Sequence, residues 1–122
     1  MDRAHFESWL TAYGRAWEAR DAQAAAALYA EDGTYQITPF VEPLRGRQAI
    51  LEYWREVART EKDIRFGCEI LAVMAEYGIA HWWASFVRVP PGAATKLDGI
   101  FLITLDNAGL CSSLREWWHK QQ

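Results

Sequence analysis

The spacing of apolar residues changes once along this 122-residue chain, near residue 64. Up to about residue 60, large apolar residues recur every three or four positions, which is the period of amphipathic helices. From residue 64 to 119 the pattern changes to long, aromatic-rich segments with a period of two, which is typical of strands. Helices followed by strands favour an α+β protein in which helices cover one face of an antiparallel sheet.

Three helices are predicted in the first half of the chain. They cover residues 2–19, residues 22–30 and the segment after Gly46, and the first two have Asp2 and Asp21 as capping residues. The second helix is rich in alanine, which favours helix on intrinsic propensity alone. We expect Gly33 to stop it by taking a left-handed conformation. The third helix is expected to end in the charged stretch 59–63.

One short strand and four long strands are predicted. They cover residues 34–38, 64–76, 79–89, 95–105 and 110–119, and Gly78, 90–92 and 106–109 separate the long ones as turns. Pro39 and Pro43 interrupt residues 40–45, so we expect a loop there with little regular pairing. A chain of this length suits a single domain, residues 1–122, with a real hydrophobic core.

The charge balance limits the partners that this chain is expected to have. The formal net charge is −3 and the basic residues are scattered, which argues against a nucleic-acid surface. No run of about 18 apolar residues is present, so no membrane span is predicted. Residues 1–5 lack a hydrophobic signal core, and we therefore expect a cytoplasmic protein. Cys68 and Cys111 are expected to be free thiols, with a cross-strand disulfide as the open alternative.

The segment 99–105 bears on association. Its odd-numbered and its even-numbered residues, which point to opposite faces of a strand, are both mostly apolar. The same holds for 80–84 apart from His81. An antiparallel sheet with one face in water normally alternates cleanly between apolar and polar residues. Both faces are therefore expected to be covered, one by the helices and the other by a second copy of the chain. The sequence predicts a homodimer through the sheet face.

Four segments resemble the nuclear transport factor 2-like superfamily, which includes the SnoaL-like polyketide cyclases and the ketosteroid isomerases. The segments are 16–21 (AWEARD), 27–35 (ALYAEDGTY), 43–50 (PLRGRQAI) and 114–119 (LREWWH). This resemblance implies a cone-shaped α+β barrel, in which three N-terminal helices pack on a strongly bent, mostly antiparallel sheet. It also implies an apolar pocket that is open at one end. The superfold serves many activities, so the resemblance specifies the fold far better than the chemistry.

The resemblance places candidate residues for isomerase chemistry. Tyr13 lies eight residues before Asp21, where ketosteroid isomerases have the tyrosine of their oxyanion hole; the alternative is a core tyrosine of the first helix. The general-base aspartate of these enzymes corresponds to Ile37 or Thr38, neither of which accepts a proton at neutral pH. Asp98 corresponds to the acid partner of that tyrosine in these enzymes only if the hairpin at the 106–109 turn carries extra residues. We therefore do not expect the steroid isomerase mechanism.

Two further residues are candidates for an acid or base. His81 interrupts an apolar strand, and its alternative role is a hydrogen-bonded core or interface histidine. Glu116 would have a raised pKa if it pointed into an apolar cone, whereas on a solvated face it would pair with Arg115 or Arg88. The sequence does not say which alternating set of strand residues faces inward.

The expected ligand is a small hydrophobic molecule. Trp17, Tyr35, Trp54 and Trp118 are predicted to line its pocket, with plain core packing as the alternative. His5, His81 and His119 are far apart in sequence, so no metal is expected. The sequence has no Gly-rich phosphate loop and no nucleotide-binding motif, so no other cofactor is expected. The resulting hypothesis is a cofactor-independent isomerase, cyclase, dehydratase or hydrolase in which Tyr13, His81, Asp98 and Glu116 are the catalytic candidates. The alternative is a non-catalytic ligand-binding or accessory dimerisation domain.

Overall fold

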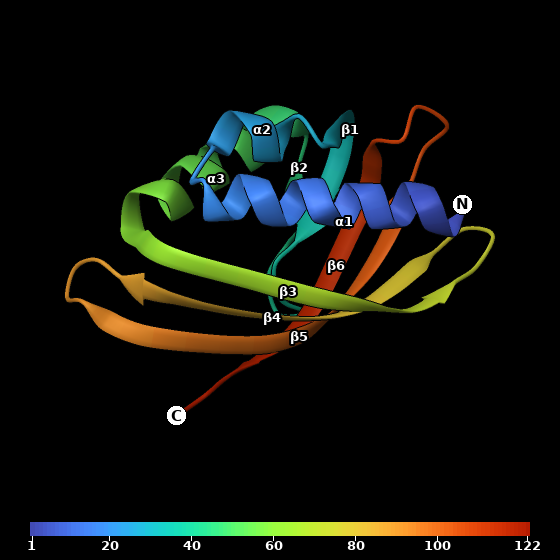
Figure 1. Ribbon diagram of the computed structural model, residues 1–122. Coiled ribbons are helices and arrows are strands. Elements are labelled where there is room, and N and C mark those ends of the chain that lie inside the picture. Colours follow the sequence, from blue (N-terminus) through green and yellow to red (C-terminus); the bar gives the residue numbers. More distant parts are fainter.

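Helices and strands segregate into two layers in the computed structural model, which describes all residues from 1 to 122. The elements follow the order α1 (Arg3–Glu18), α2 (Ala22–Ala26), β1 (Tyr29–Gln36), β2 (Leu44–Arg45), α3 (Arg47–Thr60), β3 (Glu61–Val73), β4 (Gly78–Arg88), β5 (Ala93–Leu105) and β6 (Cys111–Lys120). Figure 1 shows the three helices together on one side of a strongly curved sheet.

The six strands form one sheet in the order β2-β1-β6-β5-β4-β3. Every neighbouring pair is antiparallel except β1 and β6, which run parallel. The helices pack on this curled, open sheet, which confirms the predicted α+β fold class. None of the helices has the length and hydropathy that crossing a bilayer requires.

The first helix forms as its residue spacing predicts. The Asp2 side chain accepts a hydrogen bond from the backbone N–H of His5 at 2.9 Å, which satisfies one donor at the helix N-terminus. The apolar residues at steps of three and four are buried against the sheet, among them Phe6, Trp9, Leu10, Tyr13 and Trp17.

The predicted extension of the second helix to residue 30, with a left-handed Gly33 that stops it, is wrong. The second helix ends at Ala26, and Gly33 lies inside β1 without a left-handed conformation. The reason is tertiary pairing, because Tyr29 at the start of β1 pairs with Cys111 of β6 and overrides the helix propensity of the alanines. Gly33 is required for close approach instead, since a Cβ there would lie 2.8 Å from the Cys111 carbonyl oxygen.

Two other boundaries also differ from the prediction. Leu44 and Arg45, expected in a loop, form the short strand β2 and pair with Tyr35 and Thr34. The third helix ends at Thr60, within the charged stretch where its end was predicted, but β3 begins at Glu61 instead of residue 64, and Glu61 pairs with Arg88 at the end of β4. This second difference places Glu61 in the sheet.

The structure determines which strand residues face the helices. In β4, Trp82, Ala84 and Phe86 are buried under the helix layer, whereas His81 and Trp83 lie on the opposite surface. The same alternation buries Phe101 in β5 and Glu116 in β6. Both cysteines are free thiols; Cys111 is buried and Cys68 is half-buried.

Candidate functional site

A cavity of about 100 Å³ lies between the helices and the inner face of the sheet. Fourteen residues line it and eleven of these are hydrophobic, so its wall is mainly apolar. The four residues predicted to line a pocket, Trp17, Tyr35, Trp54 and Trp118, are all among them.

The four candidate catalytic residues divide between the two faces of the sheet. Tyr13 and Glu116 line the cavity. His81 and Asp98 lie on the opposite face, where Nε2 of His81 is 3.0 Å from both carboxylate oxygens of Asp98. The structure therefore does not bring the four residues together. In the core it is Phe101 that packs against Tyr13, with 5.4 Å between ring centroids.

Glu116 is a carboxyl group held inside the apolar layer. It lies in β6 opposite Phe101, and only 6% of the residue is exposed. The Tyr35 hydroxyl, which comes from β1, donates a hydrogen bond to Oε1 of Glu116 over 3.2 Å. Burial disfavours the ionised form and raises the pKa of Glu116 to about 8, although the Tyr35 hydrogen bond partly opposes this rise. Glu116 is therefore mostly protonated at neutral pH.

Tyrosines from three elements surround this carboxyl group. Tyr13 of α1, Tyr35 of β1 and Tyr53 of α3 all line the cavity. Burial raises the pKa of each phenol well above its ordinary value, and the negative charge of Glu116 adds to the rise. The phenols therefore remain protonated; Tyr35 donates a hydrogen bond to Glu116, and Tyr13 and Tyr53 can donate to an oxygen in the cavity.

Glu61 is a second buried carboxyl group on the cavity wall. It is also 6% exposed, and its Oε1 accepts a hydrogen bond from the Trp17 indole Nε1 over 2.9 Å. Its Oε2 lies 3.9 Å from the Arg88 guanidinium. Burial raises the pKa of Glu61, and the Trp17 hydrogen bond and the Arg88 charge oppose that rise. Glu61 therefore has two partners that favour its ionised form, whereas Glu116 has one neutral phenol.

Sequence reasoning missed Glu61 and Tyr53. Glu61 lies within the charged run 59–63, which resembles a solvated helix end and carries no signal of burial. Tyr53 did have a signal, because it completes a helical stripe with Ile50 and Val57. Tyr53 lies close enough to both carboxyl groups for either negative charge to raise its pKa.

The position expected for an isomerase base contains no base. Ile37 lines the cavity, and its carbonyl accepts a hydrogen bond from Nε1 of Trp118 over 2.8 Å. This bond joins the loop after β1 to the last strand at the wall of the cavity. No group of three His, Cys, Asp or Glu side chains is arranged to hold a metal ion.

Helices packed on a curled, open sheet around an internal cavity define the cone fold of the nuclear transport factor 2-like proteins. Residues 10–113 match the model of the SnoaL-like domain, and the chain belongs to that family. No protein of curated function matches the sequence.

Solved structures with the same fold include two that are described as enzyme-like. One is the epoxide hydrolase/cyclase-like enzyme SalBIII, which has a role in pyran ring formation in polyether salinomycin; its TM-score is 0.85 at 18% identity, over 97% of this chain and 93% of SalBIII. The other is a ketosteroid isomerase-like protein from Erwinia carotovora atroseptica SCRI1043, with a TM-score of 0.73 at 20% identity, over 98% of this chain and 95% of that one. At such identities the likeness concerns the fold alone.

Proposed function

We propose that this protein is an acid–base enzyme of the cyclase or hydrolase type, which acts without a cofactor on a small, largely apolar substrate. The observation that carries the proposal is the buried Glu116 carboxyl group on the cavity wall, with its pKa of about 8. A carboxyl group that keeps its proton at neutral pH can act as a general acid toward a substrate oxygen.

Glu61 is the proposed general base. Burial raises the pKa of Glu61, but the Trp17 N–H and the Arg88 charge oppose this rise and favour its carboxylate form. Two carboxyl groups in one cavity, with surroundings that separate their pKa values, provide an acid and a base at the same pH. Oε2 of Glu61 makes no hydrogen bond and is free to accept a proton.

The proposed step moves one proton at each end of the substrate. The Glu61 carboxylate removes a proton from a hydroxyl group of the substrate or from water, and the freed oxygen bonds to a substrate carbon. The bond between that carbon and its leaving oxygen breaks, and the leaving oxygen takes the proton of Glu116. A hydrogen bond from Tyr13 stabilises the charge that develops on this oxygen, while Tyr35 continues to donate to Glu116. Re-equilibration of the two carboxyl groups with solvent completes the cycle.

Cavity size restricts the substrate. The volume of about 100 Å³ is below the roughly 300–1,000 Å³ of common ligand pockets. The substrate must therefore be small, or the Ile37–Trp118 wall must move outward to admit it. An epoxide with a nearby hydroxyl group suits both the apolar wall and the proposed step, and SalBIII, described as epoxide hydrolase/cyclase-like, has the same fold.

The test is turnover of a panel of small hydroxy-epoxides, with products followed by mass spectrometry. We expect the wild-type protein to convert at least one of them to a diol or a cyclic ether. Glu116→Gln and Glu61→Gln should each lower kcat by at least about 100-fold, the usual contribution of a general acid or base. Glu76→Gln, at an exposed turn residue, is the matched control and should leave kcat unchanged.

Binding measured on the same panel, by quenching of tryptophan fluorescence, separates this proposal from the alternative of a ligand-binding module. Ligands that bind the wild-type cavity without any turnover would favour the binding module. Unchanged turnover in Glu116→Gln would refute the acid role directly.

A further inference from the structure

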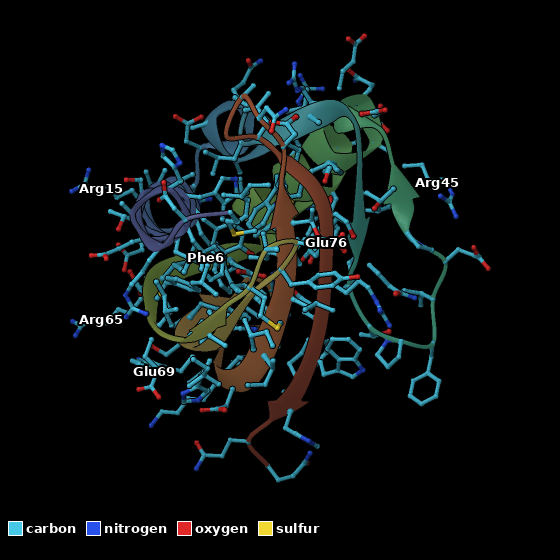
Figure 2. The ribbon with its side chains drawn as sticks, turned by 90° about the vertical axis from the view of Figure 1, so that its right-hand side faces the viewer. Phe6, Arg15, Arg45, Arg65, Glu69 and Glu76 are labelled. Atoms are coloured by element: carbon cyan, nitrogen blue, oxygen red, sulfur yellow. The ribbon has the colours of Figure 1, made fainter.

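The tryptophans between the helices and the sheet do not all have a hydrogen-bond acceptor. Figure 2 shows this side of the sheet: Phe6 lies between α1 and the sheet, while Arg65 and Glu69 of β3 point away from the core. Three indole N–H groups on this side donate to oxygens of the chain, namely Trp9 to the Leu28 carbonyl, Trp17 to Glu61 and Trp118 to the Ile37 carbonyl. Nε1 of Trp54 and Nε1 of Trp82 have no such acceptor.

Of these two groups, only the Trp82 N–H has no polar neighbour. Burial raises the pKa of the Tyr29 phenol and the Trp54 N–H opposes this rise, so the Trp54 N–H lies near the Tyr29 oxygen. Trp82 is 2% exposed, and no acceptor of the chain meets its Nε1 at hydrogen-bond distance and angle. Because a buried N–H without an acceptor is destabilising and rare in native proteins, this one calls for a functional explanation.

The Trp82 ring is held in a fixed orientation at the wall of the cavity. It stacks with Phe101, with 5.1 Å between ring centroids and 16° between ring planes, and with Phe66 at 6.3 Å and 21°. The Trp17 ring meets it edge-on at 6.1 Å. An indole packed among three rings cannot turn its N–H toward another part of the chain, so this donor is preorganised.

Gly99 leaves room for the N–H edge of this indole. It lies in β5 between Trp82 of β4 and Trp118 of β6, and both tryptophans line the cavity. A Cβ at position 99 would lie 2.9 Å from Cε2 of Trp82, the ring atom bonded to Nε1, and 2.8 Å from Cβ of Trp118. The missing side chain therefore lets the N–H edge of Trp82 lie close over the strand, between two residues of the cavity wall.

The chemistry of the indole restricts what it can bind. An indole N–H donates a hydrogen bond and accepts none, so its partner in the cavity has to be an acceptor such as a carbonyl or ether oxygen. The proposed step already gives each reacting oxygen a partner, because Glu61 takes the hydroxyl proton and Glu116 and Tyr13 serve the leaving oxygen. An oxygen at Trp82 is then a further oxygen, which does not react.

We propose that the Trp82 N–H binds a non-reacting carbonyl or ether oxygen of the substrate and thereby fixes the orientation of the substrate in the cavity. Trp82 is then a specificity-determining residue, and the substrate class narrows to apolar molecules that carry this additional acceptor. A site with a buried donor discriminates against ligands that lack the acceptor, because the donor stays unpaired. The inference rests on the proposed function in one respect, since it takes the cavity as the substrate site.

Two probes of matched shape test the inference without any reaction. Cyclopentanone has a carbonyl oxygen where methylenecyclopentane has a CH₂ group, and both rings are smaller than benzene, which an apolar cavity of about 150 Å³ can hold. NMR follows the ¹⁵N–¹H signals of the seven indoles as each probe is added to the wild-type protein, with Trp82 assigned through its neighbours in the chain. We expect cyclopentanone to move the Trp82 proton signal downfield until it saturates, whereas methylenecyclopentane should bind without this downfield movement.

Trp82→Phe removes the N–H and keeps an aromatic ring. In the same titrations, its affinity for cyclopentanone relative to methylenecyclopentane should fall by about 2- to 10-fold, the contribution of one neutral hydrogen bond. The ratio of the two affinities cancels the effect of the larger cavity that phenylalanine leaves. The matched control is Trp83→Phe, the same exchange at the next residue, which lies on the opposite surface of the sheet and should leave both affinities unchanged.

Three results would each overturn the inference: no binding of cyclopentanone, the same movement of the Trp82 signal with both probes, or an unchanged affinity ratio in folded Trp82→Phe. The titration of the wild-type protein decides the matter even if Trp82→Phe does not fold. Failure of the enzyme proposal is a different result, because a protein that turns over no hydroxy-epoxide can still show the downfield shift with cyclopentanone.

Discussion

The burial of Glu116 predicts an unusual dependence of stability on pH. The folded protein holds the pKa of Glu116 at about 8, against an ordinary value of 4.5. Between these values the folded protein keeps a proton that the unfolded chain has released, so the free energy of unfolding falls as the pH rises. The group contributes its full stabilisation below pH 4.5 and loses it progressively up to pH 8.

The size of the effect follows from the difference between the two pKa values. At 1.36 kcal/mol for each pKa unit, the difference between 4.5 and about 8 corresponds to about 5 kcal/mol over the whole range. Between pH 5 and pH 8 the expected loss is about 3 to 4 kcal/mol, because the curve flattens near each pKa. A loss of this size is a large share of the 5–15 kcal/mol that stabilises a typical domain, which makes it measurable.

Comparison with Glu116→Gln isolates this contribution. The amide does not titrate, while Glu61 and all other groups are common to both proteins and cancel in the difference. Urea unfolding at pH 5, 6, 7 and 8 gives the free energy of unfolding of each protein. We expect the wild-type value minus the variant value to fall by about 3 to 4 kcal/mol over this range. A difference that stays flat with pH would refute the raised pKa and, with it, the acid role of Glu116.

Two other substitutions have outcomes that the structure predicts. Tyr35→Phe removes the hydrogen bond that favours the ionised form of Glu116, so the pKa of Glu116 should rise further, by about one unit, in an infrared titration of the protonated carboxyl group; an unchanged pKa would contradict the contact. Gly33→Ala places a Cβ 2.8 Å from the Cys111 carbonyl oxygen and should lower the free energy of unfolding by about 1–3 kcal/mol in urea; wild-type stability would show that β1 and β6 are less closely packed.

The order of the elements and the buried stripe of the first helix could be predicted from the sequence. Both depend on local properties, since Asp2 caps the helix that it precedes and the spacing of Phe6, Tyr13 and Trp17 is a property of one segment. The change of period after the third helix likewise predicted the antiparallel strands. Residues 27–33 departed from the prediction because β6, about eighty residues further along, pairs with them.

The set of residues that the site contains depends on contacts between segments that are far apart in sequence. A strand pattern alone does not say which alternating set is buried, because that follows from what covers the sheet. The helices cover the side that contains Glu116, and this gives Glu116 a buried site and His81 an outward one. Glu61 is buried because β3 begins at that residue and pairs it with Arg88. Periodicity along the chain thus determined the helices and strands. Contacts between segments far apart in sequence determined which carboxyl groups are buried and which remain exposed to solvent.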